Sequence, residues 1–203
     1  MPKATFFNLP EKKRQSLIKA MEIEFSRVPL YEASIANIVK TAGISRGSFY
    51  QYFRDKEDAY YYILKEQASR RNKQFIQQLH THQGDLFEAI TAFYYDLLIE
   101  LPDEKEYNFF RNALLNVTHQ IETIFNEIIE SNLKKDGMEE ITKLINRDLL
   151  NIESDSELTH VIHIISAVAF RNFVEKFTKE LSDQEAIESF IAEMNLLKKG
   201  IAK

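Results

Sequence analysis

Four polar side chains in one short segment could hydrogen-bond to the edges of nucleic-acid bases. Phe49 and Phe53, four residues apart, share one face of a predicted helix and turn the other face outward. On that outer face an arginine fork could bind a guanine, and a glutamine amide could bind an adenine. The polar set consists of Arg46, Ser48, Tyr50 and Gln51.

A preceding helix and a tight turn would hold this segment in place. Ser34 is a good N-cap for the first helix, because its hydroxyl can accept from an orphan amide. Gly43 supplies the left-handed backbone that ends that helix, and Ser45 is the N-cap of the next. Residues 34–53 therefore read as a helix-turn-helix. Periodicity alone gives only an αα-hairpin, so a hairpin without DNA affinity stays open at this point.

The run AGISRGSFYQYF at residues 42–53 continues into Asp55, Lys56 and Glu57. It resembles the signature of the tetracycline-repressor (TetR) family of bacterial transcriptional regulators, A-G-V-S-x-G-x-[FLI]-Y-x-[YH]-F-x-[SND]-K-[ED]. The resemblance covers residues 8–65. The family usually has a glycine shortly after the phenylalanine that ends the first helix, whereas Phe25 here is followed by SRVPL.

Each polar position of the segment has an expected role on DNA. The amides at a helix N-terminus favour a phosphate, and a residue with little or no side chain lets the backbone come close to it. The position of Lys56 resembles that of the family's phosphate-contacting lysine. Arg46, Ser48 and Gln51 are expected to read base edges. The expected phosphate contacts are Ser34, Ser45, the amide of Gly47, Tyr50 and Lys56.

Charge is unevenly distributed along the 203 residues, whose net charge is −5. Residues 1–56 hold ten Lys and Arg against five Asp and Glu, while residues 57–203 hold 16 against 26. A basic head on an acidic body suits a head that meets phosphates, with chance clustering as the alternative. The absence of cysteine fits a reducing cytoplasm, and neither a secretion signal nor a membrane span is expected.

Helical spacing without strand signals predicts an all-α fold. A three-helix DNA-binding head (residues 1–56) would precede a helical effector-binding and dimerisation body (residues 57–203), with about nine to ten helices in all. The arm at residues 1–9 is expected to be disordered, with reaching DNA as the alternative. The expected helices are 10–26, 34–42, 46–53, 56–80, 85–101, 102–115, 118–133, 155–180 and 182–199, with an amphipathic segment at 138–151.

The last two predicted helices carry apolar stripes that we assign to dimerisation. Two such helices from each subunit would form a four-helix interface, as the family resemblance also implies. A two-fold dimer would read a palindrome with half-sites about 34 Å apart. The alternative is a stripe packed inside one subunit. The assigned residues are Ile165, Ala169, Phe173, Ile187, Phe190, Ile191, Met194 and Leu197.

The middle helices are rich in aromatic residues. The resemblance implies a small, often apolar effector in this part of the body, whose binding changes the spacing of the heads. A mostly apolar pocket with a few polar groups is expected. For each candidate, a role in the core is the alternative. The candidates are Tyr94, Phe109, Asn112, Asn116, His119, Phe125 and His163.

Other chemistry finds little support in the sequence. Glu157, His160 and His163 could share a helix face, but a fourth ligand is missing, so no metal is expected and no cofactor is assigned. The motifs of common enzyme classes do not occur, so an enzyme is not expected. Together with the charge pattern and the apolar stripes, the family resemblance implies a cytoplasmic repressor that binds a palindromic operator as a homodimer and is released by a small apolar effector. The alternatives are a regulator without an effector and an all-α adaptor or enzyme.

Overall fold

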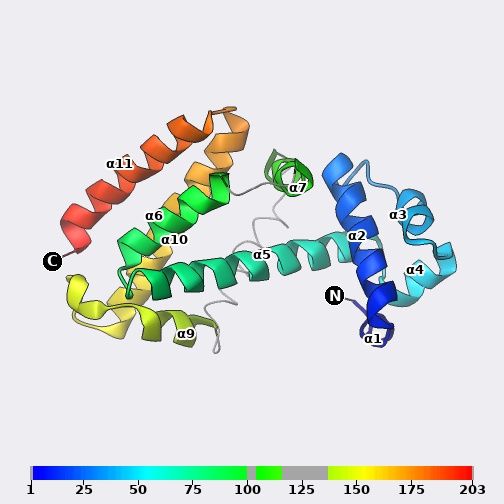
Figure 1. Ribbon diagram of the computed structural model, residues 1–203, viewed down its shortest axis with the longest axis horizontal. Helices are drawn as coiled ribbons and strands as arrows, with labels where there is room; N and C mark the ends of the chain where they lie inside the picture. The colour runs from blue at the N-terminus through cyan, green and yellow to red at the C-terminus, as the bar shows by residue number, and fades with distance from the viewer. Residues whose placement is uncertain (1, 100–103, 116–136, 203) are drawn as a thin grey trace. The chain divides into compact units, whose positions relative to one another are not determined.

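The computed structural model describes residues 2–99, 104–115 and 137–202. Its regular elements are helices, which confirms the all-α prediction (Figure 1). They are α1 (Ala4–Phe7), α2 (Glu11–Arg27), α3 (Ile35–Ala42), α4 (Arg46–Tyr52), α5 (Lys56–Thr81), α6 (Leu86–Ile99), α7 (Glu104–Leu115), α9 (Gly137–Leu144), the 3₁₀ helix η1 (Arg147–Leu149), α10 (Asp155–Thr178) and α11 (Asp183–Ile201). The helix expected at 118–133 lies outside the described residues.

The chain divides into two compact units. The first draws on the ranges Met1–Ser69 and Pro102–Ile124, and the second on Arg70–Leu101 and Phe125–Lys203. The first unit therefore contains α1 to α4, the start of α5, and α7. The second contains the rest of α5, α6, α9, η1, α10 and α11. The domain boundary expected after residue 56 stays a prediction.

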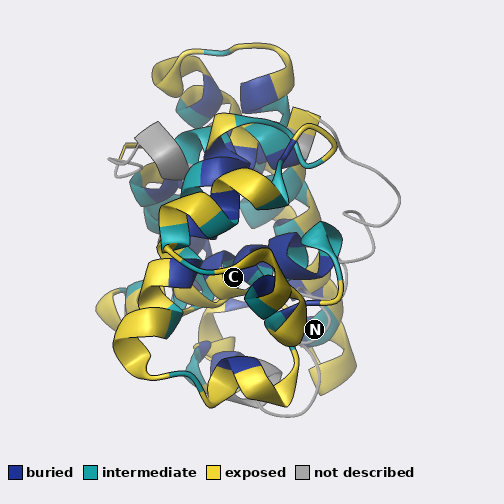
Figure 2. Cartoon of the chain, turned by 90° about the vertical axis from the view of Figure 1, so that its right-hand side faces the viewer, coloured by how far each residue is buried: buried dark blue, intermediate teal, exposed yellow. Residues whose placement is uncertain are grey.

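An aromatic core holds the first unit together. Phe25 and Tyr60 meet edge to face with ring centroids 5.1 Å apart, and Phe109 of α7 lies 5.4 Å from the ring of Tyr60. Burial raises the pKa of the Tyr60 hydroxyl far above its ordinary range. Figure 2 shows such buried residues in dark blue. Asn112 of α7 donates from its amide to the carbonyl of Ser26 at 3.0 Å, which ties α7 to the end of α2.

The expectation of a disordered N-terminal arm is wrong. Residues 4–7 form α1, and Phe6 has no exposed surface. Its ring lies 5.0 Å from that of Phe53 and 5.1 Å from that of Tyr62. Burial of the Phe6 ring contributes about 1.5–3 kcal/mol towards ordering the arm, and hydrogen bonds from Lys3 and Thr5 to α4 add to it.

Local capping rules explain where the helices of the second unit begin. The carboxylate of Asp85 accepts from the amides of Phe87 and Glu88, both at 3.0 Å, and starts α6. Ser182 and Glu185 form a reciprocal capping box that starts α11. None of the helices in the described ranges is both long and apolar enough to cross a membrane.

Candidate nucleic-acid interface

The helix-turn-helix adopts the geometry that its residues predict. Gly43 has a φ of 67°, in the left-handed region, and ends α3. Ser45 caps α4 by accepting from the amide of Ser48 at 3.0 Å. Phe49 is fully buried, and its ring lies 5.5 Å from that of Phe53. α4 is thus fixed by its buried face.

The opposite face of α4 is open to solvent. Arg46, Gly47, Tyr50 and Gln51 are exposed, while Ser48 is half-buried beside Ser45. The guanidinium carbon of Arg46 lies over the ring of Tyr50, 6.0 Å from its centroid, at the outer limit of a cation–π contact. A solvent-facing surface with an arginine, a phenol and an amide suits contact with phosphates and base edges.

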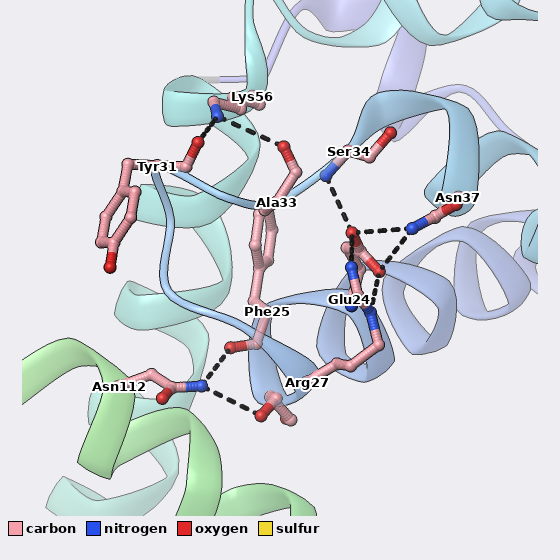
Figure 3. Close-up of polar contacts among 10 residues, drawn as sticks. Glu24, Phe25, Arg27, Tyr31, Ala33, Ser34, Asn37, Lys56 and Asn112 are labelled. Atoms are coloured by element: carbon pink, nitrogen blue, oxygen red, sulfur yellow. Dashed lines mark hydrogen bonds and ion pairs between the residues drawn. The ribbon is translucent and has the colours of Figure 1, made fainter.

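The carboxylate of Glu24 in α2 holds the start of α3 (Figure 3). Glu24 is only 3% exposed and accepts from the backbone amide of Ser34 at 2.8 Å. It also accepts from the side-chain amide of Asn37 at 3.1 Å. The guanidinium of Arg27 closes the network with two hydrogen bonds of 2.9 and 2.8 Å.

These bonds correct the expectation for Ser34. Among the described residues the Ser34 hydroxyl makes no capping bond to α3, and Glu24 accepts from the Ser34 amide instead. Burial would raise the pKa of Glu24, but the hydrogen bonds from Arg27, Ser34 and Asn37 outweigh it and lower the pKa. The ionised carboxylate is therefore part of the folded helix-turn-helix.

Lys56 at the start of α5 binds the loop between α2 and α3. Its ammonium donates to the carbonyl of Tyr31 at 2.9 Å and to that of Ala33 at 3.2 Å, as Figure 3 shows. An ammonium group has three donors, and these bonds use two of them. Lys56 thus fixes the loop in addition to the phosphate role expected for it, which stays a prediction.

Two family models match the chain. "Bacterial regulatory proteins, tetR family" matches residues 17–59, and "Tetracyclin repressor-like, C-terminal domain" matches residues 85–201, more than half of the chain. The chain belongs to the TetR family. It is therefore a DNA-binding transcriptional regulator of a non-enzymatic family.

One curated relative is similar to the chain over a short range. BetI of Yersinia pestis (strain Pestoides F), an HTH-type transcriptional regulator, is 50% identical over 44 residues, which is 22% of this chain and 22% of BetI. The match therefore spans about a fifth of the length of this curated relative.

Two solved structures share the fold. A TetR-family regulator of Mesorhizobium loti MAFF303099 has a TM-score of 0.66 at 16% identity, covering 95% of this chain and 98% of its own. FadR of Bacillus subtilis, solved in complex with stearoyl-CoA, has a TM-score of 0.59 at 16% identity, covering 87% and 97%. At this level of identity the likeness concerns the fold alone.

The predicted effector residues of this TetR-family chain fall in both units. Phe109 and Asn112 lie in the first unit, where Phe109 is buried in the core and Asn112 binds backbone carbonyls of α2. Tyr94 and His163 lie in the second unit. Asn116, His119 and Phe125 lie outside the described residues.

Tyr94 and His163 have opposite environments in the second unit. The ring of Tyr94 stacks on Phe190 with centroids 4.0 Å apart, and its buried hydroxyl has no hydrogen-bond partner in the described part of the chain. Burial, with smaller effects of Glu193 and Glu175, raises its pKa. His163 is exposed on α10. Among the described residues, no three His, Asp or Glu side chains gather as a metal site would require.

The residues assigned to dimerisation divide into three groups by burial. Ile165, Phe173, Phe190 and Met194 are buried within the single chain and have almost no surface to offer a second subunit. Ile191 is 38% exposed. Ala169, Ile187 and Leu197 are half-buried. Helical spacing in the sequence could not separate burial inside one chain from burial between two.

Proposed function

We propose that this TetR-family regulator binds a palindromic operator as a homodimer and represses transcription. The observation that carries the proposal is the solvent-facing side of α4, whose opposite face is buried and whose preceding helix α3 is held by the Glu24 network. Arg46, Ser48 and Gln51 are the proposed base readers. Ser34, Ser45, Gly47, Tyr50 and Lys56 are the proposed phosphate contacts.

Selection of duplexes from a random pool tests the proposal. The purified protein is expected to enrich a palindrome at about 150 mM salt, where non-specific phosphate attraction is screened. An Arg46→Ala, Tyr50→Ala double variant serves as the control and is expected to enrich none. Loss of DNA binding at this salt, with no enriched sequence, would favour the alternative of an all-α adaptor or enzyme.

Arg46→Ala alone is expected to cost about 1–3 kcal/mol at one base position of the selected operator. Lys56→Ala is the matched contrast, because it also removes one positive charge but should weaken binding to all sequences alike. Titration of the operator and of its single-base variants measures both effects. An equal loss on every sequence for Arg46→Ala would remove its base-reading role.

The proposed dimer face lies on α10 and α11. These helices are held together by the amide of Asn172, which donates to Glu193 at 2.6 Å. Their solvent sides carry large apolar residues: Ile164 is 46% exposed and Leu196 is 67% exposed. A two-fold dimer interface contains each of these residues once from each subunit. The apolar area buried in the dimer is therefore twice the area that one subunit contributes.

An Ile164→Glu, Leu196→Glu double variant is therefore expected to be a monomer at micromolar concentration. It would bring four negative charges to the interface, where each is desolvated without a partner. Sedimentation of wild type and variant measures the change. Leu149→Glu, at a residue of η1 that is 40% exposed, is the matched control and should leave the oligomeric state unchanged. A variant that sediments like wild type would exclude this face.

We also propose that a small apolar effector releases the operator. The partnerless hydroxyl of buried Tyr94 supports a polar anchor in the second unit, and Bacillus subtilis FadR, which shares the fold, was solved with stearoyl-CoA. A thermal-shift screen with apolar compounds, including acyl thioesters, separates this proposal from a regulator without an effector, because a ligand of the folded state raises the Tm.

A further inference from the structure

The N-terminal arm contacts the C-terminal end of α4. The backbone amide of Lys3 donates to the carbonyl of Tyr52 at 2.8 Å, and its ammonium donates to the carbonyl of Tyr50 at 2.8 Å. The hydroxyl of Thr5 donates to the carbonyl of Gln51, which lies between them. Three successive carbonyls of α4 are thus bound by two residues of the arm.

These carbonyls are the ones that the end of a helix leaves without a helical donor. The chain leaves the helix at Phe53, whose φ of −126° and ψ of 148° are extended. Arg54, whose amide would otherwise reach back to Tyr50, donates to the carboxylate of Asp58 at 3.2 Å. The last carbonyls of a helix must find other partners, and the arm supplies them.

Two further features stabilise the contact between the arm and α4. Phe6 anchors the arm, because it is fully buried against Phe53 and Tyr62. The ammonium of Lys3 is a positive charge at the C-terminal end of α4, where the helix dipole favours a cation. With only seven residues, α4 is too short to be stable by itself and depends on contacts at its ends.

We propose that Lys3, Thr5 and Phe6 are positioning residues that cap the recognition helix. The inference rests on the proposed function, in which the outer face of α4 reads DNA. Tyr50 and Gln51, whose carbonyls the arm binds, carry two of the side chains assigned to DNA. The arm lies outside residues 17–59, the range matched by the DNA-binding family model. A fixed last turn holds these side chains in the orientation that the operator requires.

The test compares Lys3→Ala, Lys3→Arg and Thr5→Val in the full chain. The first measurement is hydrogen exchange of the amides of residues 49–53 without DNA. Lys3→Ala and Thr5→Val are each expected to speed this exchange by about 3- to 10-fold, the factor that one net hydrogen bond represents. Lys3→Arg keeps a cationic donor and should exchange like wild type. Lys13→Ala, at an exposed lysine of α2, is the matched charge control and should change nothing.

The second measurement is affinity for the selected operator at several salt concentrations. Lys3→Ala and Thr5→Val are expected to lose the same factor of about 3 to 10, with the salt dependence of wild type. If exchange is unchanged in both variants, the proposal is wrong. It is also wrong if Lys3→Ala lowers the salt slope by about one while Thr5→Val binds normally, because Lys3 then contacts a phosphate directly. If wild type selects no operator, the proposed function fails, and the exchange experiment still decides the capping.

Discussion

Replacing Glu24 with alanine is expected to cost the first unit about 2–4 kcal/mol of unfolding free energy and to lower operator affinity at least tenfold. The substitution leaves the amide of Ser34 and the side chain of Asn37 without the acceptor that they share. Arg27 is half-exposed and can be hydrated, which keeps the loss below that of a fully buried ion pair. Because α3 packs against α4, disorder at the start of α3 is expected to displace the face of α4 that is proposed to contact DNA.

Chemical unfolding and operator titration measure the two effects of Glu24→Ala. Glu24→Gln is the informative second variant, because it keeps an oxygen acceptor for Ser34 and Asn37 and removes only the charge. It should lose less than half as much free energy. Glu32→Ala removes an exposed carboxylate of the following loop, which interacts with Tyr31 and Arg27, and should cost less than about 1 kcal/mol, as surface pairs do. Wild-type stability of Glu24→Ala would show that the network is dispensable.

The same carboxylate gives the first unit a dependence on pH. The pKa of Glu24 in the folded protein is lowered from its ordinary value of 4.5, because the hydrogen bonds outweigh burial. Its contribution is therefore complete above about pH 4.5 and is lost as the pH falls through the folded-state pKa. Wild-type stability should fall more steeply below pH 4.5 than that of Glu24→Gln, in which the group cannot titrate.

The sequence predicted those features that depend on neighbouring residues. The φ of Gly43, the cap at Ser45 and the buried face of Phe49 and Phe53 all follow from spacing within a few positions. These local rules also predicted where α6, α10 and α11 begin. A family whose signature lies in such a segment can be identified from it.

Features that depend on distant contacts could not be predicted in this way. Ser34 has the right residue type for a cap, but a carboxylate ten residues earlier binds its amide. The order of the arm depends on Phe6 meeting Phe53 and Tyr62, which are far away in the sequence. A buried glutamate followed by an arginine at i+3 is a weak signal, since such pairs are usually solvated.

Replacing Gly84 with alanine is expected to destabilise the second unit by about 3–5 kcal/mol. Gly84 has a φ of 82°, which costs a residue with a side chain about 1–2 kcal/mol. A Cβ there would lie 2.3 Å from the carbonyl oxygen of Leu144 and 2.6 Å from the amide nitrogen of Asn146. Both are backbone atoms, so the turn and the segment after α9 must move apart. The hydrogen bond of 2.9 Å from the Asn146 amide to the Gly84 carbonyl would be lost with them.

Hydrogen exchange over residues 141–150, together with chemical unfolding, measures this effect. Gly200→Ala is the matched control, because a Cβ at that position of α11 meets nothing within 4 Å. It should be neutral or stabilise by up to about 1 kcal/mol through helix propensity. Exchange in α2 to α4, which belong to the first unit, should stay as in wild type for both variants. If Gly84→Ala unfolds like wild type, the close backbone approach does not hold α9 and η1 in place. The expected loss of unfolding free energy would instead show that the main chain of residues 144–146 packs directly on Gly84, in the turn before α6, where a side chain does not fit.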